Sequence, residues 1–373
     1  MEESRFGILS EEQLQSIINN KVCLNTKAVV KTATKILKTY LNERDLGDID
    51  DLVNVSSEQL NLCLRKFYAE LRKVDGTKYA RKSMVTIRNG LQQHFIKTRS
   101  EDIISEDRFN TSSALFKAVL VQLKKAGVGE TKSKEPIVIE DMEKLYESAA
   151  FSVDTSEGLQ NKTLFEYLYY FCNRGRENLR EVQKSDFCIA VDPSKREYVS
   201  VINKQTKNHR GYDIHNKDHK QSRMYDRPGD SRCPVASFKK YLSKLHSSNP
   251  NFWQRPKRKY SDDEDTWYEN SALGKNTLYS IMSRVSEDYT LSKRYTNYCV
   301  RATSITVLDH KGVEARHIIG VSGHKSETYI KLYSSHLSED KKRQMSDILS
   351  DNVPPPPPPA KRSARCEQFE PLR

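Results

Sequence analysis

The stretch Tyr295-Thr-Asn-Tyr-Cys-Val-Arg-Ala-Thr303, followed by Gly320-Val-Ser-Gly-His324, contains the residues that decide the fold. The first stretch surrounds Arg301 at the start of an expected helix. The second is a glycine turn before a histidine, and Tyr333 follows that histidine nine residues later in another expected helix. Taken separately, His324 is typical of a turn and Tyr333 of a core aromatic residue, so the rest of the chain must decide what they do.

Two basic clusters lie upstream of these residues. Cys172-Asn-Arg-Gly-Arg-Glu177 ends a helix rich in Leu and Tyr, and Lys204-Gln-Thr-Lys-Asn-His-Arg-Gly211 follows an expected strand. Arginine is permanently charged and grips phosphate oxygens as a fork. Taken alone, the first cluster indicates a structural arginine pair near a turn, and the second indicates a solvated hairpin.

The composition restricts the class of protein. The chain has 373 residues, a net charge of +12 and a pI near 9.2, which favours a polyanionic partner such as nucleic acid. The sequence has no apolar run of the length that a membrane span needs, and Met-Glu-Glu-Ser-Arg at the start has no apolar core for a secretory signal. Seven scattered cysteines without a CxxC pair indicate reduced thiols in the cytosol or nucleus.

The first part of the chain predicts a compact all-α domain over 26–125, after an extension over 1–25 that holds one short helix around 11–19. Apolar residues recur at spacings of three and four, which is typical of helices with one buried face. Ser56 and Gln59 predict a capping box at the start of the second helix of this domain, and Asp75-Gly76 is expected to end that helix. The third helix is expected from about 79 to 95 and the fourth from about 114 to 125. A linker is expected over 126–136.

The second part predicts a mainly helical domain over 137–350 with a small antiparallel sheet. Strands are expected over Phe187–Val191, over Glu197–Ile202 and near Tyr212. The expected helices, by residue numbers, are 139–151, 155–173, 235–245, 275–286, 297–309, 313–319 and 327–335. Six consecutive prolines from 354 and a basic run after them predict an extended, disordered tail over 351–373.

Together, the clusters give the order Arg174, Lys207, Arg301, His324 and Tyr333. This order resembles the Arg–Lys–His-x-x-Arg–Gly-His–Tyr pattern of tyrosine recombinases and integrases. The local sequence around Arg301 and His324 is similar to that of the Crypton group. These are eukaryotic mobile elements that encode such an enzyme and gave rise to domesticated animal proteins. The resemblance covers about 26–350. It implies a mainly α fold with a small antiparallel sheet, in which a helical core-binding domain precedes an α+β catalytic domain.

The resemblance implies a strand-exchange chemistry. Tyr333 would attack the scissile phosphorus and form a 3′-phosphotyrosine, and its hydroxyl needs activation because a tyrosine has an unperturbed pKa near 10. Arg174 and Arg301 would neutralise charge on the phosphate oxygens, Lys207 would protonate the leaving 5′-oxygen, and His324 would hydrogen-bond the phosphate. No cofactor, metal or small-molecule substrate is expected.

The sequence departs from the family pattern at one position. Tyr298 stands where the family usually has a histidine, and a phenol can donate a hydrogen bond but is a poor proton shuttle at neutral pH. Arg176 remains an alternative to Arg174, although Arg174 has a glutamate three residues on, as in the family. Lys204 remains an alternative to Lys207.

The expected partner is double-stranded DNA, held between the two domains by salt-sensitive phosphate contacts. A dimer or tetramer on DNA is what the resemblance implies, in the nucleus and away from membranes. Two rivals remain: a domesticated, catalytically silent DNA-binding or chromatin protein with this fold, and a transcription factor of other ancestry. The candidate DNA contacts of the helical domain and of the hairpin are, together, Lys78, Arg81, Lys82, Arg88, His209 and Arg210.

Overall fold

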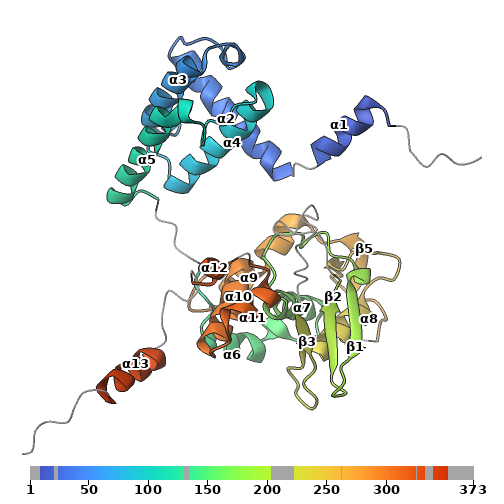
Figure 1. Ribbon diagram of the computed structural model, residues 1–373. Coiled ribbons are helices and arrows are strands. Elements are labelled where there is room, and N and C mark those ends of the chain that lie inside the picture. Colours follow the sequence, from blue (N-terminus) through green and yellow to red (C-terminus); the bar gives the residue numbers. More distant parts are fainter. Residues whose placement is uncertain are drawn as a thin grey trace, which may run out of the picture. The chain divides into compact units, whose positions relative to one another are not determined.

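A computed structural model describes residues 9–20, 24–129, 134–202, 222–261, 263–324, 326–331 and 339–351. Contacts divide the chain into two compact units, residues 1–132 and 133–373 (Figure 1), and this division falls within the expected linker. The two units have separate hydrophobic cores. Each unit therefore buries its own apolar surface.

The first unit is built from helices. Its core lies among four of them, and α1 precedes these four in the chain. The helices are α1 (Glu11–Asn20), α2 (Leu24–Glu43), α3 (Ser57–Glu70), α4 (Arg81–Arg99) and α5 (Asn110–Lys125), with the short 3-10 helices η1 (Asp51–Val53) and η2 (Asp107–Phe109) between them.

Local sequence signals account for how these helices begin and pack. The Ser56 hydroxyl accepts from the backbone N–H of Gln59, and the Gln59 side chain accepts from the Ser56 N–H, which is the expected capping box. Helix α4 packs on α2 at Gly90, where a Cβ would lie 2.6 Å from the Cβ of Ala33. A glycine at this position lets the two helices approach closely.

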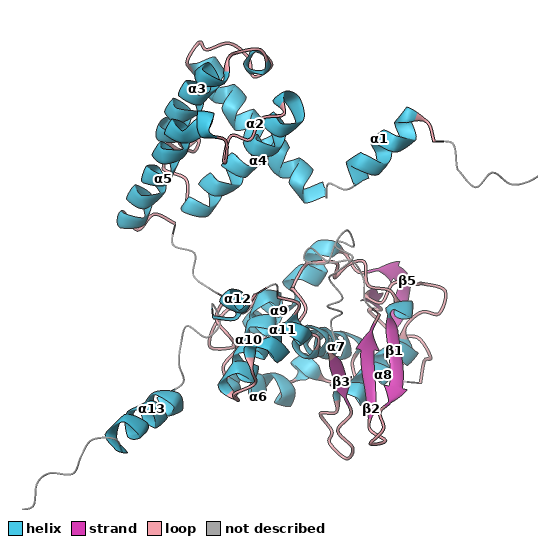
Figure 2. Ribbon diagram, in the orientation of Figure 1, coloured by secondary structure: helices cyan, strands magenta, loops and turns pink. Residues whose placement is uncertain are grey.

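The second unit combines helices with two small sheets, as Figure 2 shows. Its first helices are α6 (Ile139–Glu147), η3 (Ala149–Phe151) and α7 (Ser156–Tyr170). After η4 (Lys184–Asp186), three antiparallel strands follow in the order β1 (Phe187–Val191), β2 (Glu197–Val201) and β3 (Arg223–Tyr225). Later come α8 (Pro234–Lys244), the hairpin of β4 (Gln254–Pro256) and β5 (Tyr268–Ala272), and then α9 (Lys275–Asp288), α10 (Asn297–His310), α11 (Ala315–Ser322), α12 (Glu327–Lys331) and α13 (Glu339–Asp351).

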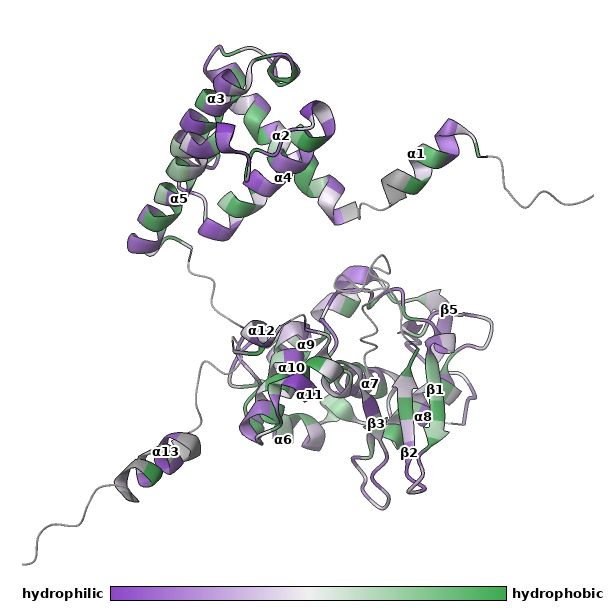
Figure 3. Ribbon diagram, viewed as in Figure 1, coloured by the Kyte–Doolittle hydropathy of each residue, from purple (hydrophilic) through white to green (hydrophobic). Residues whose placement is uncertain are grey.

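The three-stranded sheet has one face toward the core of the second unit. Val199 on β2 and Met224 on β3 are directly opposite each other and buried, and the ring of Phe187 at the start of β1 packs edge-on against Phe238 and at a tilt against Phe252. Figure 3 shows β1 in the green of hydrophobic residues. The other face of the sheet is on the surface.

Helix α7 is buried on nearly all sides, and its buried side chains are polar as well as apolar. The Lys162 ammonium lies 2.5 Å from the Glu166 carboxylate and donates to the Ser237 hydroxyl at 2.8 Å. Both charged side chains are at most 3% exposed. Burial raises the pKa of Glu166 although Lys162 opposes that shift. These contacts join α7 to α8.

The first residues of the second unit form hydrogen bonds with α10 and with the residues just before it. The backbone N–H of Ile137 donates to the Thr303 hydroxyl at 2.8 Å, and Asp141 accepts from the hydroxyls of Ser292 and Tyr295. Burial raises the pKa of Asp141, but the hydrogen bonds from Ser292 and Tyr295 outweigh burial, so the pKa is lowered from its usual value. We call these contacts of Ile137 and Asp141 the entry strap.

The fold class expected from the sequence, mainly α with a small antiparallel sheet, is confirmed. Three details differ. Helix α3 ends at Glu70, before Asp75-Gly76, and the β4–β5 hairpin and α13 were not expected. The expected strand near Tyr212, the end of the helix over 327–335 and the tail from 352 lie outside the described residues. Among the described helices, none combines the length and apolar character needed to cross a lipid bilayer.

Candidate active site

Arg301 is the centre of a buried polar cluster on α10. Its side chain is only 4% exposed, and its guanidinium donates to the backbone oxygens of Cys172 and Ser322, the latter at 3.0 Å. The same guanidinium lies 3.1 Å from Nε2 of His324. A buried charge needs such partners, and these fix the arginine between the loop after α7 and the end of α11.

His324 is placed by the way in which α11 ends. Gly323 takes the left-handed conformation that commonly closes a helix, with φ of +67°. Nδ1 of His324 lies 2.7 Å from the Ser322 hydroxyl, and its ring stacks on that of Tyr329 with 6.3 Å between centroids. The histidine is therefore oriented by Ser322 on one nitrogen and Arg301 on the other.

The loop that carries Arg174 is held against α10 on both sides of that residue. Before it, the oxygen of Cys172 accepts from Arg301, and after it, the oxygen of Gly175 accepts from the amide of Asn297 at 3.2 Å. A Cβ on Gly175 would lie 2.7 Å from Asn297 and 2.8 Å from the nitrogen of Tyr298, so only glycine allows this approach.

The two arginines of this loop have different surroundings. Arg174 is 28% exposed at its side chain and pairs with Glu177. Arg176 is exposed, and its guanidinium lies over the ring of Tyr279 at 5.5 Å. Burial raises the pKa of Tyr279, and Glu181 adds to the shift. Arg174 lies between the two anchors, whereas Arg176 lies after them.

Tyr298 lies one turn before Arg301 on α10. A spacing of three residues puts both on one side of the helix. Tyr298 is 39% exposed, in contrast to the buried Arg301. The position at which the family pattern has a histidine is thus accessible to a large ligand.

Tyr333, Lys207 and Lys204 lie outside the described residues, as do His209 and Arg210. The described chain before Tyr333 ends at Lys331 in α12. Ile330 of α12 is 2% exposed and joins a small hydrophobic cluster with Ile305 of α10 and Ile318 of α11. Helix α12 therefore packs on α11, which in turn packs on α10, the helix that carries Arg301.

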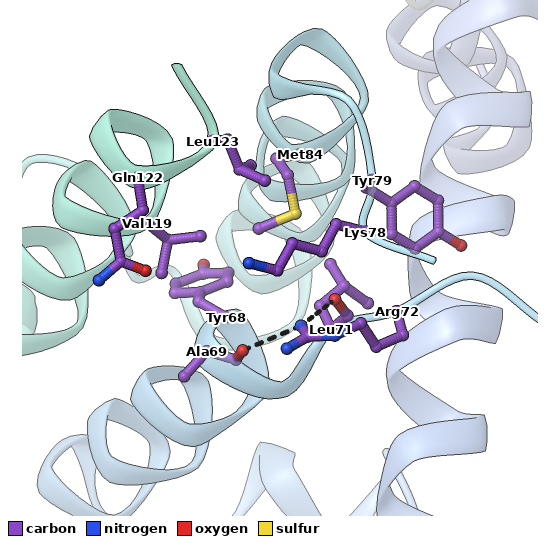
Figure 4. A pocket seen from close by; sticks show the side chains of 10 residues that line it. All are labelled: Tyr68, Ala69, Leu71, Arg72, Lys78, Tyr79, Met84, Val119, Gln122 and Leu123. Atoms are coloured by element: carbon purple, nitrogen blue, oxygen red, sulfur yellow. Dashed lines mark hydrogen bonds between the residues drawn. The ribbon is translucent and has the colours of Figure 1, made fainter. Parts of the chain in front are cut away.

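Three candidate DNA contacts of the helical unit are exposed: Lys78, Arg81 and Lys82. Lys78 also lines a hollow of about 50 Å³, where Figure 4 shows its side chain extended between Tyr68 and Met84. Typical small-molecule sites measure roughly 300 Å³ or more, so this hollow has no room for such a ligand.

Arg88, the fourth candidate in this unit, is buried, which corrects the expectation from the sequence. It is 7% exposed, donates to the Ser113 hydroxyl at 2.5 Å and lies 4.6 Å from the centroid of the Phe116 ring. Its guanidinium is enclosed by the Ser113 hydroxyl, the Phe116 ring and the backbone oxygen of Ile103 within the helical core. Arg88 instead ties α4 to α5.

Sequence reasoning did not identify Asn297, Ser322 or the Cys172 oxygen as parts of the site. Asn297 is 1% exposed and also bonds the backbone of Leu278 and Met282 on α9. In sequence, an asparagine at a helix start is typical of a cap, and a carbonyl oxygen gives no signal at all. Within the described residues, no three His, Cys, Asp or Glu side chains gather as a metal site would require.

Solved structures similar to this chain identify the fold. The Tn1549 transposon integrase in complex with a circular intermediate DNA has a TM-score of 0.50 and 14% identity, covering 90% of this chain and 97% of that one. The XerH site-specific recombinase bound to palindromic difH substrate also has a TM-score of 0.50 and 14% identity, covering 91% and 85%. The chain has the fold of tyrosine recombinases.

Sequence comparisons find relatives of another kind. A family described as "Domain of unknown function (DUF3504)" matches residues 137–287, and the QRICH1 domain family matches residues 23–123. The human uncharacterized protein KIAA1958 is 21% identical over 74% of this chain and 39% of its own length. Human zinc finger MYM-type protein 2 is 23% identical over 63% of this chain and 18% of its own length. The chain thus spans well under half of these relatives.

Proposed function

We propose that the chain binds duplex DNA and cuts and rejoins its strands through a covalent bond to Tyr333. The observation that carries this proposal is the contact between Arg301 and His324, beside a loop whose Arg174 is held to α10 on both sides. Arg301 and His324 are separated in sequence and meet in the fold, and Arg174 lies on the loop whose Cys172 and Gly175 oxygens contact α10. Arg174, Arg301 and His324 are also three of the five residues of the recombinase-like order.

The proposed reaction uses each group once. The Tyr333 hydroxyl loses its proton to solvent as its oxygen forms a bond to the scissile phosphorus, and the bond to the 5′-oxygen breaks, which leaves a 3′-phosphotyrosine and a free 5′-hydroxyl. Arg174 and Arg301 stabilise the charge that develops on the non-bridging oxygens, and His324 donates a hydrogen bond there once a phosphate oxygen replaces Arg301 at its Nε2. Lys207 gives its proton to the leaving oxygen. Attack by a 5′-hydroxyl reverses the steps and rejoins a strand.

A nicked suicide duplex tests this function. We expect wild-type protein to form a covalent adduct that survives denaturing electrophoresis, and Tyr333→Phe to form none. Tyr329→Phe is the matched control, since Tyr329 is the other tyrosine of the segment and is 53% exposed. An adduct that persists in Tyr333→Phe would assign the nucleophile elsewhere and refute the proposal.

A catalytically silent DNA-binding protein is the second candidate, and Tyr298 favours it. This exposed phenol stands where the family has a proton-transferring histidine. Tight duplex binding by wild type without an adduct, together with an adduct in Tyr298→His, would support the silent protein. The relatives fit that alternative, because they are much longer proteins in which this region is one part.

The proposal also covers the lineage of the chain, its compartment and its assembly on DNA. We place the chain in the Crypton lineage, acting in the nucleus as a dimer or tetramer on DNA. Sedimentation of the protein with and without a duplex site measures the assembly. A complex of one protein per duplex at all concentrations would contradict it.

A further inference from the structure

Four side chains form a continuous row on the outer face of the three-stranded sheet. The guanidinium of Arg196 lies 5.1 Å from the ring of Tyr225, the rings of Tyr225 and Tyr198 are 5.4 Å apart, and the guanidinium of Arg223 lies 4.3 Å from the ring of Tyr198. We call Arg196, Tyr225, Tyr198 and Arg223 the Arg–Tyr row. One cation lies at each end of the row, and the two aromatic rings lie between them.

The strand register explains why the row lies at the surface. Tyr198 on β2 is directly opposite Tyr225 on β3, and their neighbours Val199 and Met224 point to the other face, where they are buried. On the β1 side, Tyr198 is opposite Ala190, and Ser200 is opposite Cys188. The neighbours of Tyr198 on β1 therefore have small side chains.

The stability of the sheet does not by itself explain why two exposed arginines lie beside the two tyrosines. Exposed cation–π pairs contribute about 0.5–1 kcal/mol each. Arg196 and Arg223 are nevertheless both exposed, and Arg196 also pairs with Asp226 at 3.6 Å. Nucleic-acid bases stack on tyrosine rings, and arginines beside the rings neutralise the phosphates of the same strand.

We propose that the Arg–Tyr row binds an unpaired DNA strand, with bases stacked on Tyr198 and Tyr225 and phosphates paired to Arg196 and Arg223. The charge complementarity of the two arginines to a polyanion selects this partner. The inference rests on the proposed function in one respect: β2 and β3 are also the strands on either side of the segment that carries Lys204 and Lys207. Strand exchange would release unpaired nucleotides from the site that those lysines serve.

Binding of a fluorescein-labelled dT12 oligonucleotide, followed by fluorescence anisotropy with the full chain, tests the proposal. We expect Tyr198→Leu/Tyr225→Leu to weaken dT12 binding by at least about tenfold, because each stacked base contributes on that scale. Duplex binding should change less than about threefold. Arg284→Ala is the charge control, since Arg284 is 39% exposed and lies on α9. Equal dT12 affinity of wild type and the double variant would overturn the proposal.

A second variant gives a direct contact signal and guards against a folding defect. The native tryptophans, Trp253 and Trp267, are at most 2% exposed, so Tyr198→Trp adds the one accessible tryptophan among the described residues. Stacking of a base on it should quench its fluorescence when dT12 is added, and unchanged fluorescence at saturation would contradict the contact. Tyr333→Phe should bind dT12 like wild type, so a failed adduct assay and a failed Arg–Tyr row remain distinguishable.

Discussion

The two units differ in what they bury. The helical unit buries mainly apolar stripes, such as Leu60, Leu64 and Phe67 of α3, with a few charged groups among them, including Arg88 and the Arg99–Glu101 pair. The second unit buries charged and polar groups in the middle of α7 and α10, including Lys162, Glu166 and Arg301. The comparison teaches that the first core mainly holds helices together, whereas the second also fixes the loops on which the candidate site depends.

Breaking the buried pair on α7 should have the largest effect. Lys162→Met leaves Glu166 without its charge partner in a fully buried position, and such losses cost about 3–5 kcal/mol. Urea denaturation of the variant measures the change in the free energy of unfolding. Lys162→Met/Glu166→Leu should recover much of the loss, and a double variant no more stable than the single one would contradict this account.

Gly175→Ala tests the close approach of the Arg174 loop to α10, without removing a charge. The added methyl group would press on the backbone of Asn297 and Tyr298, and overpacking of this kind costs about 1–3 kcal/mol. We expect adduct formation on the suicide duplex to fall at least about tenfold while duplex affinity is retained. Gly320→Ala is the control, because a Cβ there meets nothing within 4 Å. Equal adduct yields from both variants would show that the approach at Gly175 is dispensable.

Arg88→Met tests one buried charge of the helical unit. Its loss removes the contacts to Ser113 and Phe116, which should cost about 1–2 kcal/mol in calorimetric unfolding. Duplex affinity of the folded protein should remain that of wild type. Lys82→Ala is the opposite case, for which stability should hold and affinity fall. A reversed pattern would restore Arg88 as a phosphate contact.

The smallest effect concerns pH. Hydrogen bonds from the hydroxyl and N–H of Ser105, and from the N–H of Ile104, hold the pKa of Asp102 at about 2. Because the pKa is depressed in the folded state, this stabilisation is present above the ordinary value of 3.8 and is lost as pH falls toward 2. Asp102→Asn should therefore be less stable by under about 1 kcal/mol at pH 6, with the difference shrinking at pH 2. A difference that grows in acid would reverse the sign.

Local patterns predicted the helical unit better than they predicted the candidate site. The Ser56–Gln59 capping box and the apolar stripe of α3 are short-range signals, and the structure has both. The β4–β5 hairpin was missed because Pro256 and the charged residues around it disguise an edge strand. Arg301 and His324 were predicted as members of one site from their order in the sequence. Their anchors were not, because Asn297 and the Cys172 oxygen acquire their roles only in the fold. The roles of Tyr333 and Lys207 stay predictions.

The entry strap has a mechanical consequence. The chain enters the second unit at a point where Ile137 is already bonded to Thr303 and Asp141 to Tyr295, on and beside the helix of Arg301. We therefore expect tension applied to the chain at Ile137 to reach that helix first, through the contact with Thr303. A pull from the first unit would act on the arginine's own scaffold.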